Sequence, residues 1–157
     1  MKTIESHDLA RTIILTLERL ALVLTDEVDS EEAKTLPDCE HHAQVPIAGQ
    51  GQELLFIISA SSGFMLEFTA SLLGLETEQV DLAVLGPSSL EDLASVLTAE
   101  LVPLLGASAA EIRLGPTRVL SSEELGSVVP ARAPDCSCSL DAGGEHLRFL
   151  LYHDKRG

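Results

Sequence analysis

The stretch Ser88–Gly106 reads SSLEDLASVLTAELVPLLG, and it carries most of the fold prediction. Its leucines and alanines recur every three or four positions, which is the spacing of one face of an α-helix. Ser88 followed by Glu91 is the pattern of a capping box, so we expect the helix to begin at Ser88. Four residues lie opposite the apolar stripe and are expected to face outward: Asp92, Ser95, Ala99 and Pro103.

Pro103 is expected to kink or end this helix, because proline has no N–H for the carbonyl of Ala99 and its ring crowds that turn. The outward face then presents Val96, Ala99, Val102 and Pro103, which are small and apolar. Such a face is either a docking patch for a partner or a surface that the rest of the chain or a second copy covers.

The segments upstream of this helix alternate between helical and extended patterns. Apolar residues at helical spacing predict an amphipathic helix over 9–24, and the acid-rich stretch 26–38 is expected to be a loop. Short apolar runs bounded by glycine and serine predict strands over 40–48 and 53–59. A further helix is expected to open at Ser61–Gly63 and to end at Gly74.

Downstream of Gly106, four short segments separated by Gly, Pro and Ser clusters predict strands of an antiparallel sheet: 111–114, 118–120, 135–140 and 145–153. A faint repeat accompanies them, because residues 51–58 resemble 144–151 and residues 15–18 resemble 97–100. We therefore predict an α+β fold, with helices packed on a mainly antiparallel sheet and two loosely repeated halves.

Composition limits the function classes. A chain of 157 residues that is 45% hydrophobic can build one ordinary core, so we expect a single domain over 1–157. The net charge of −15 argues against nucleic acids and anionic membrane surfaces as partners. Glu5 and Asp8 interrupt any signal-peptide pattern, so we expect a cytoplasmic protein whose three cysteines are free thiols.

The order of elements resembles the CheX-like chemotaxis phosphatase domain of the CheC/CheX family. The resemblance covers roughly residues 5–153 and rests on LLGLE at 72–76, the helix ending at Gly106 and LGPTRV at 114–119. Family members that are phosphatases carry Glu-x-x-Asn, followed by Gly, on the exposed face of this helix. The resemblance implies that the Asn orients the attacking water and that the Glu grips the phosphorylated response regulator.

This sequence departs from the family at that motif. With Gly106 aligned to the family's Gly, the Glu position is Ala99 and the Asn position is Val102; with Glu100 aligned to the family's Glu, the Asn position is Pro103. No asparagine occurs anywhere in the chain. Since hydrolysis of an aspartyl phosphate needs a group that positions the water, no catalytic residue is expected.

We therefore expect a non-catalytic, acidic, cytoplasmic domain of chemotaxis or related bacterial signal transduction, without a cofactor. It would bind a response regulator, another signalling protein or a family partner through Val96, Ala99, Glu100, Val102 and Pro103. Two alternatives stay open. One is an active phosphatase of a CheY-type regulator that uses Glu100 and a glutamine at a non-standard site, and the other is a structural homodimer formed through exposed sheet edges.

Two further groups of residues have side chains suited to chemistry. Cys39, His41 and His42, together with Cys136 and Cys138, are zinc-type ligands, but neither segment has a Cys-x-x-Cys knuckle, so no metal site is expected. His146 and His153 fall on the last predicted strand without a neighbouring nucleophile. They are expected to be partly exposed strand residues without a catalytic role.

Overall fold

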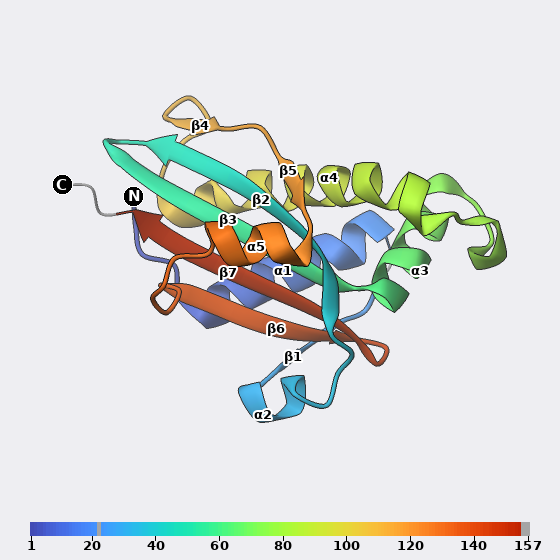
Figure 1. The fold of residues 1–157 in the computed structure, drawn as a ribbon. Helices are drawn as coiled ribbons and strands as arrows, with labels where there is room; N and C mark the ends of the chain where they lie inside the picture. The colour runs from blue at the N-terminus through green and yellow to red at the C-terminus, as the bar shows by residue number, and fades with distance from the viewer. Residues whose placement is uncertain (22, 155–157) are drawn as a thin grey trace.

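A single antiparallel sheet organises the chain, and the computed structural model describes residues 1–21 and 23–154 (Figure 1). The strands are β1 (Asp26–Val28), β2 (Cys39–Gly49), β3 (Gln52–Ser61), β4 (Ile112–Leu114), β5 (Arg118–Leu120), β6 (Cys136–Ala142) and β7 (Glu145–Asp154). The helices are α1 (Ser6–Ala21), α2 (Ser30–Ala33), α3 (Ser62–Leu73), α4 (Leu82–Leu101) and α5 (Ser122–Val128), with 3₁₀ turns η1 (Thr77–Gln79) and η2 (Pro103–Leu105). The α+β prediction is confirmed.

Two long hairpins form the centre of the sheet, whose order is β1-β6-β7-β3-β2-β4, with β5 also paired to β2. The β2–β3 hairpin turns at Gln50–Gly51 and the β6–β7 hairpin turns at Gly143–Gly144, and all four of these residues have positive φ. Two-residue turns of this kind match the twist of paired strands, and they favour glycine because most side chains are strained at positive φ. The predicted strands in these regions are confirmed.

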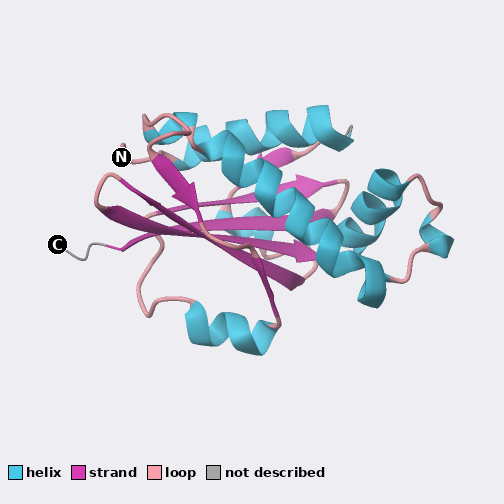
Figure 2. Cartoon of the chain, turned by 90° about the horizontal axis from the view of Figure 1, so that it is seen from above, coloured by secondary structure: helices cyan, strands magenta, loops and turns pink. Residues whose placement is uncertain are grey.

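The sheet carries a layer of helices on one face, where α1 and α4 contact each other (Figure 2). Leu9, Ile13 and Leu17 of α1, and Leu93 and Leu97 of α4, are completely buried. They pack against alternate residues of the central strands. Two of these strand residues, Phe56 and Phe149, stack on each other with ring centroids 6.1 Å apart. The main hydrophobic core therefore lies between the sheet and these two helices.

The opposite face of the sheet, which we call the open face, is covered in part by α5 (Figures 1 and 2). Leu125 of α5 packs with Ile57, Leu120 and Tyr152 in a second, smaller core. Because α5 has only seven residues, sheet surface is left uncovered on both sides of it. Two hollows lie on this uncovered surface, one on each side of the helix.

Helix α5 begins with a complete capping box. Ser121 Oγ accepts a hydrogen bond from the Glu124 backbone N–H at 3.1 Å, and the Glu124 carboxylate accepts one from the Ser121 backbone N–H at 3.1 Å. The capping box expected at Ser88 is not formed, because Ser88 lies inside α4 and donates its hydroxyl to the Leu85 carbonyl at 3.4 Å.

Ser121→Ala is expected to lower the free energy of unfolding by about 1 kcal/mol, because it removes a satisfied helix cap. Ser88→Ala is the matched control, since Ser88 is exposed within α4 and its hydroxyl donates only to the Leu85 carbonyl of its own helix. Urea denaturation of both variants measures the difference. A Ser88→Ala variant that is the less stable of the two would contradict this account of the helix starts.

The two halves of the chain exchange their edge strands. Each half runs from a long helix, α1 or α4, through a short strand and a short helix into a long hairpin. β1 of the first half pairs with β6 of the second, while β5 of the second half pairs with β2 of the first. The short helices follow the same exchange, because α2 packs on β6 and α5 packs on β2. This topology supports the prediction of two loosely repeated halves.

Three predicted boundaries are wrong. Helix α4 begins at Leu82 and passes through Pro87, so Ser88 lies inside it; Gly86, Ser89 and Leu90 are buried, and this packing outweighs the local capping pattern. The segment 26–38 is not only a loop, because it contains β1 and the capped helix α2. Helix α1 ends at Ala21, whereas Leu24 is 75% exposed and residue 22 lies outside the described residues.

The end of α4 agrees with the prediction for Pro103. The helix stops at Leu101, Val102 caps it, and Pro103 opens η2, which ends at Gly106 with φ of 70°. Within residues 1–21 and 23–154, no helix combines the length and the apolar composition needed to cross a membrane.

Candidate functional site

The outer surface of the helical layer holds a shallow hollow of about 550 Å³ between α1 and the end of α4. We call the surface formed by Leu15, Ala99, Glu100, Pro103 and Leu104 the helical face. Leu15 of α1 is 50% exposed, Ala99 and Pro103 are exposed, and Leu104 is half-buried. The helical face therefore presents apolar side chains to solvent beside charged ones.

One ion pair crosses the helical face. Arg19 of α1 lies 3.4 Å from the Glu100 carboxylate, and the two side chains are 67% and 41% exposed. An exposed pair of this kind adds little to stability, because water screens it and two long side chains must be held in place. Its carboxylate is therefore available to a partner at small cost.

Pro103 stands between two hollows, and Ala99 lines one of them. A second hollow, of about 420 Å³, lies on the other side of α4, and it is lined by Ala99, Pro103, Ala107, Ile112 and Leu114. Pro103 lines both hollows. The predicted outward position of Ala99 and Pro103 is confirmed, since both are exposed.

Val102 also lines the second hollow, but it is almost wholly buried. Its side chain is only 8% exposed and joins the main core, so the prediction that it faces outward is wrong. Val96 is half-buried. Regular helical spacing explains the position of Val102, because it follows the buried residues Ala94 and Thr98 by eight and four positions and so lies at the edge of the buried side of α4.

The hollow between α1 and α4 contains carboxylates and hydroxyls but no side-chain amide among its lining residues. Thr16, one of the two threonines there, donates its hydroxyl to the Thr12 carbonyl at 2.8 Å, so its proton is already used. Glu18 and Glu100 are the two carboxylates. Such a set can accept hydrogen bonds from a partner, but it offers no amide to orient a water molecule.

The candidate zinc ligands are not brought together. Cys136 and Cys138 point into the core under the helices, while His42 points to the open face and bonds Ser59 and Ser122 there. His41 faces the Ser62 hydroxyl at 2.9 Å. Among the described residues, no group of three or more His, Cys, Asp or Glu side chains could hold a metal ion.

The thiols are also poor metal ligands at neutral pH. Burial raises the pKa of Cys39 to about 11 and that of Cys138 to about 12, and burial also raises the pKa of Cys136. Thiols with such values stay protonated, whereas metals bind the thiolate. The three cysteines are free, as expected.

Buried polar side chains line the open face beside α5. His42 and Ser59 are 2% and 0% exposed and bond each other at 2.7 Å, and the backbone N–H of His146 donates to the hydroxyl of buried Ser61 at 3.0 Å. His146 is 8% exposed, so the expectation that it is a partly exposed residue is wrong. Its Nδ1 faces the Pro37 carbonyl at 3.3 Å and Nε2 faces Ser139 Oγ at 3.2 Å. Since a carbonyl only accepts, Nδ1 carries the proton.

These two histidines predict a pH-dependent stability. Burial lowers the pKa of both His42 and His146 below the ordinary value of 6.5, and the Arg148 charge lowers both further. Below that value the unfolded chain binds protons that the folded chain does not, so the free energy of unfolding falls as the pH drops from about 7 to about 5.5. Urea denaturation at the two pH values measures this loss.

His42→Gln is expected to reduce the loss of stability in that pH window. His7→Gln is the control for the substitution itself, because the His7 side chain is 80% exposed and lies outside the buried group around His42. An equal pH dependence in wild type and His42→Gln would refute the role given to His42.

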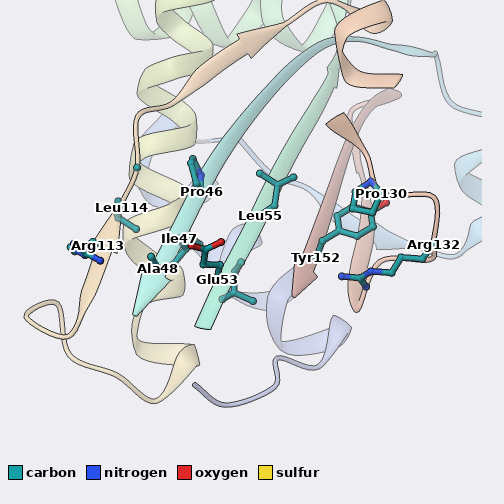
Figure 3. A pocket seen from close by; sticks show the side chains of 12 residues that line it. Pro46, Ile47, Ala48, Glu53, Leu55, Arg113, Leu114, Pro130, Arg132 and Tyr152 are labelled. Carbon is teal, nitrogen blue, oxygen red and sulfur yellow. The ribbon is translucent and has the colours of Figure 1, made fainter. Parts of the chain in front are cut away.

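On the open face, at the end where the β2–β3 hairpin turns, lies an apolar groove of about 620 Å³. Pro46, Leu55 and Tyr152 form its floor, and Figure 3 shows Arg113 and Arg132 on opposite sides of them. The Arg132 guanidinium lies 5.5 Å from the Tyr152 ring centre and donates to Asp135 at 2.9 Å. The groove therefore has one arginine fixed in place, and the sheet separates it from the helical face.

Sequence reasoning missed several of these residues. Leu15 and Arg19 line the hollow between α1 and α4, and the repeat of 15–18 in 97–100 was the signal that these two helices play matching parts. Arg148 and Tyr152 lie on the open face of β7. They were not singled out because nothing in the sequence says which side of the final strand α5 covers.

Comparisons with known proteins agree with the fold. No protein-family model matches the chain, and no curated protein sequence matches it. Among solved structures, CheX from Vibrio vulnificus aligns with a TM-score of 0.69 and 12% identity over 93% of this chain and 96% of that chain. CheX in a CheX–CheY–BeF₃–Mg²⁺ complex from Borrelia burgdorferi aligns with a TM-score of 0.69 and 12% identity, over 97% of this chain and 99% of that chain.

The FliM middle domain from Vibrio alginolyticus aligns with a TM-score of 0.56 and 8% identity over 91% of this chain and 87% of that chain. Identities this low establish shared architecture and not shared activity. The chain therefore has the fold of the CheX and CheC-like chemotaxis proteins.

Proposed function

We propose that this chain is a CheX-like domain of bacterial signal transduction that binds a response regulator through the helical face without hydrolysing its phosphate. The support is the fold together with one observation: Pro103 occupies an exposed position three residues after Glu100 on the helical face. A proline side chain has no hydrogen-bonding group, so it cannot orient a water molecule.

The burial pattern favours one of the two motif alignments. Alignment on Gly106 gives the Asn position to Val102, whose side chain is only 8% exposed at the second hollow and packs mainly in the core. Alignment on Glu100 gives it to Pro103, which is exposed. Under the second alignment Glu100 keeps the gripping role that the family resemblance implies, and only the water-positioning residue is missing.

A partner of this kind has precedent in one similar structure, because the Borrelia burgdorferi CheX is seen in a complex with CheY. We infer the same class of partner here, and a cytoplasmic location follows from it. We also infer that residues 1–157 act as one domain, since the main core joins both halves of the chain.

The alternatives are weaker on specific grounds. An active phosphatase needs a glutamine near Glu100, and none lines the hollow between α1 and α4. A homodimer through sheet edges would use β1 on one edge or β4 and β5 on the other, which have three residues each and offer few backbone groups for pairing.

The direct test is titration calorimetry of the protein with a chemotaxis-type response regulator, phosphorylated and unphosphorylated. We expect a dissociation constant in roughly the micromolar range, as for transient signalling complexes, and tighter binding of the phosphorylated form. The proposal fails if the response regulators of the source organism all give no heat of binding.

A further inference from the structure

A hollow of about 420 Å³ on the open face, beside the start of α5, is lined largely by charged and polar side chains. We call it the polar hollow and define it by Lys34, Asp38, Glu40, Ser122, His146 and Arg148. It lies under the segment that follows α2 and beside the start of α5. The sheet separates it from the helical face, so it plays no part in the function proposed above.

Arg148 is the central feature of the polar hollow. It is half-buried on β7, in register with Ser59 of β3 and Ser139 of β6. Its Nε is buried and has no hydrogen-bond partner among the described residues. No carboxylate of those residues forms an ion pair with its guanidinium, whereas Arg19, Arg118 and Arg132 each have one.

The side chains packed directly beside Arg148 are neutral and do not compensate its charge. His42 and His146 are kept neutral by burial, and the Cys39 thiol is protonated at neutral pH. The Ser61 hydroxyl already donates to Glu145 at 2.7 Å. A guanidinium whose Nε is buried without an acceptor costs free energy, and an anion that enters the hollow would recover it.

The rim of the polar hollow has the opposite charge. Asp38 and Glu40 are exposed there, while Lys34 is paired with Glu31 at 3.0 Å. In a chain with net charge −15, these carboxylates would repel a simple anion. A simple cation would be repelled by the positive charge of Arg148. A small molecule that carries both charges satisfies both ends of the hollow.

We propose that the polar hollow binds a free α-amino acid, with the carboxylate held by Arg148 and the ammonium group held by Asp38 and Glu40. Arginine suits this role because its fork of N–H donors matches a carboxylate. The hollow has the size of a small-molecule site. No covalent chemistry is implied, since the protonated Cys39 thiol is a poor nucleophile.

NMR titration of the full chain tests the proposal. Each of the common L-amino acids is added to millimolar concentration while the ring signals of His146 and the backbone amides of β7 are followed. We expect saturable shifts with at least one amino acid. Its deaminated and decarboxylated analogues should each bind about tenfold more weakly, because each lacks one charge-assisted interaction. Absence of any saturable shift overturns the proposal, and so does equal affinity for the deaminated analogue.

Arg148→Met and Arg113→Met are the matched variants. Both remove one guanidinium from the open face, but Arg113 lies on exposed β4 away from the polar hollow. Arg148→Met should abolish the shifts, Arg148→Lys should weaken binding, and Arg113→Met should bind as the wild type does. An Arg148→Met protein that is folded by circular dichroism and still binds with wild-type affinity overturns the proposal.

Discussion

Phe149→Ala is expected to lower the free energy of unfolding by about 3–5 kcal/mol, more than the loss of a helix cap or of any exposed side chain. Phe149 is completely buried at the centre of β7 and stacks on Phe56 of β3, under the helical layer. Its removal leaves a cavity that neither the paired strands nor the packed helices can close. Urea denaturation monitored by circular dichroism measures the loss.

Leu24→Ala is the control for this prediction. Leu24 is also a large apolar residue, but it is 75% exposed, so the substitution should change the free energy of unfolding by less than about 0.5 kcal/mol. Equal losses for the two variants would mean that the core does not lie between the sheet and the helices.

Ala99→Arg is expected to weaken response-regulator binding by at least about tenfold without changing the free energy of unfolding. Ala99 is exposed on α4 as part of the helical face and lines the second hollow, so a long side chain there would hold a partner away from the helical face. Arginine is a good helix former, so the helix itself should be unaffected.

Val84→Arg is the matched control for Ala99→Arg. Val84 is 68% exposed on the same helix but lies near its N-terminal end, away from the helical face. The two variants add the same charge to the protein, so any difference in binding reports position alone. Wild-type affinity in the Ala99→Arg variant would exclude the helical face as the docking surface.

The sheet could be predicted from the sequence because its central strands carry strong local signals. Apolar runs bounded by turn residues mark the two hairpins at 39–61 and 136–154, and the glycines mark their turns. The short elements β1 and α2 could not be predicted, since three or four residues carry no periodicity. They form because the neighbouring strand β6 offers an edge and a surface.

The start of α4 and the orientation of Val102 were mispredicted. Ser88 and Glu91 have the spacing of a cap, but burial of Gly86 and Ser89 extends the helix backward to Leu82. At the other end, Pro103 was correctly expected to end the helix, whereas Val102 joins the core because it follows buried Thr98 by one helical turn. Local patterns identified the elements, while tertiary packing set their limits.

The polar side chains on the open face gave no sequence signal of their own. Ser59, Ser61 and His42 occupy strand positions that usually read as solvent-facing, yet all three are buried. Their burial depends on α5 and the segment after α2, which come from distant parts of the chain. Only the assembled fold therefore brings Arg148 and its neighbours into one hollow.

The most direct test of the central claim is the decay rate of a phosphorylated chemotaxis-type response regulator, measured with this protein in stoichiometric excess. The account predicts a decay rate equal to that of the regulator alone, together with binding detected in the same sample. An accelerated decay would contradict it, because some group on the helical face would then be positioning water where Pro103 cannot.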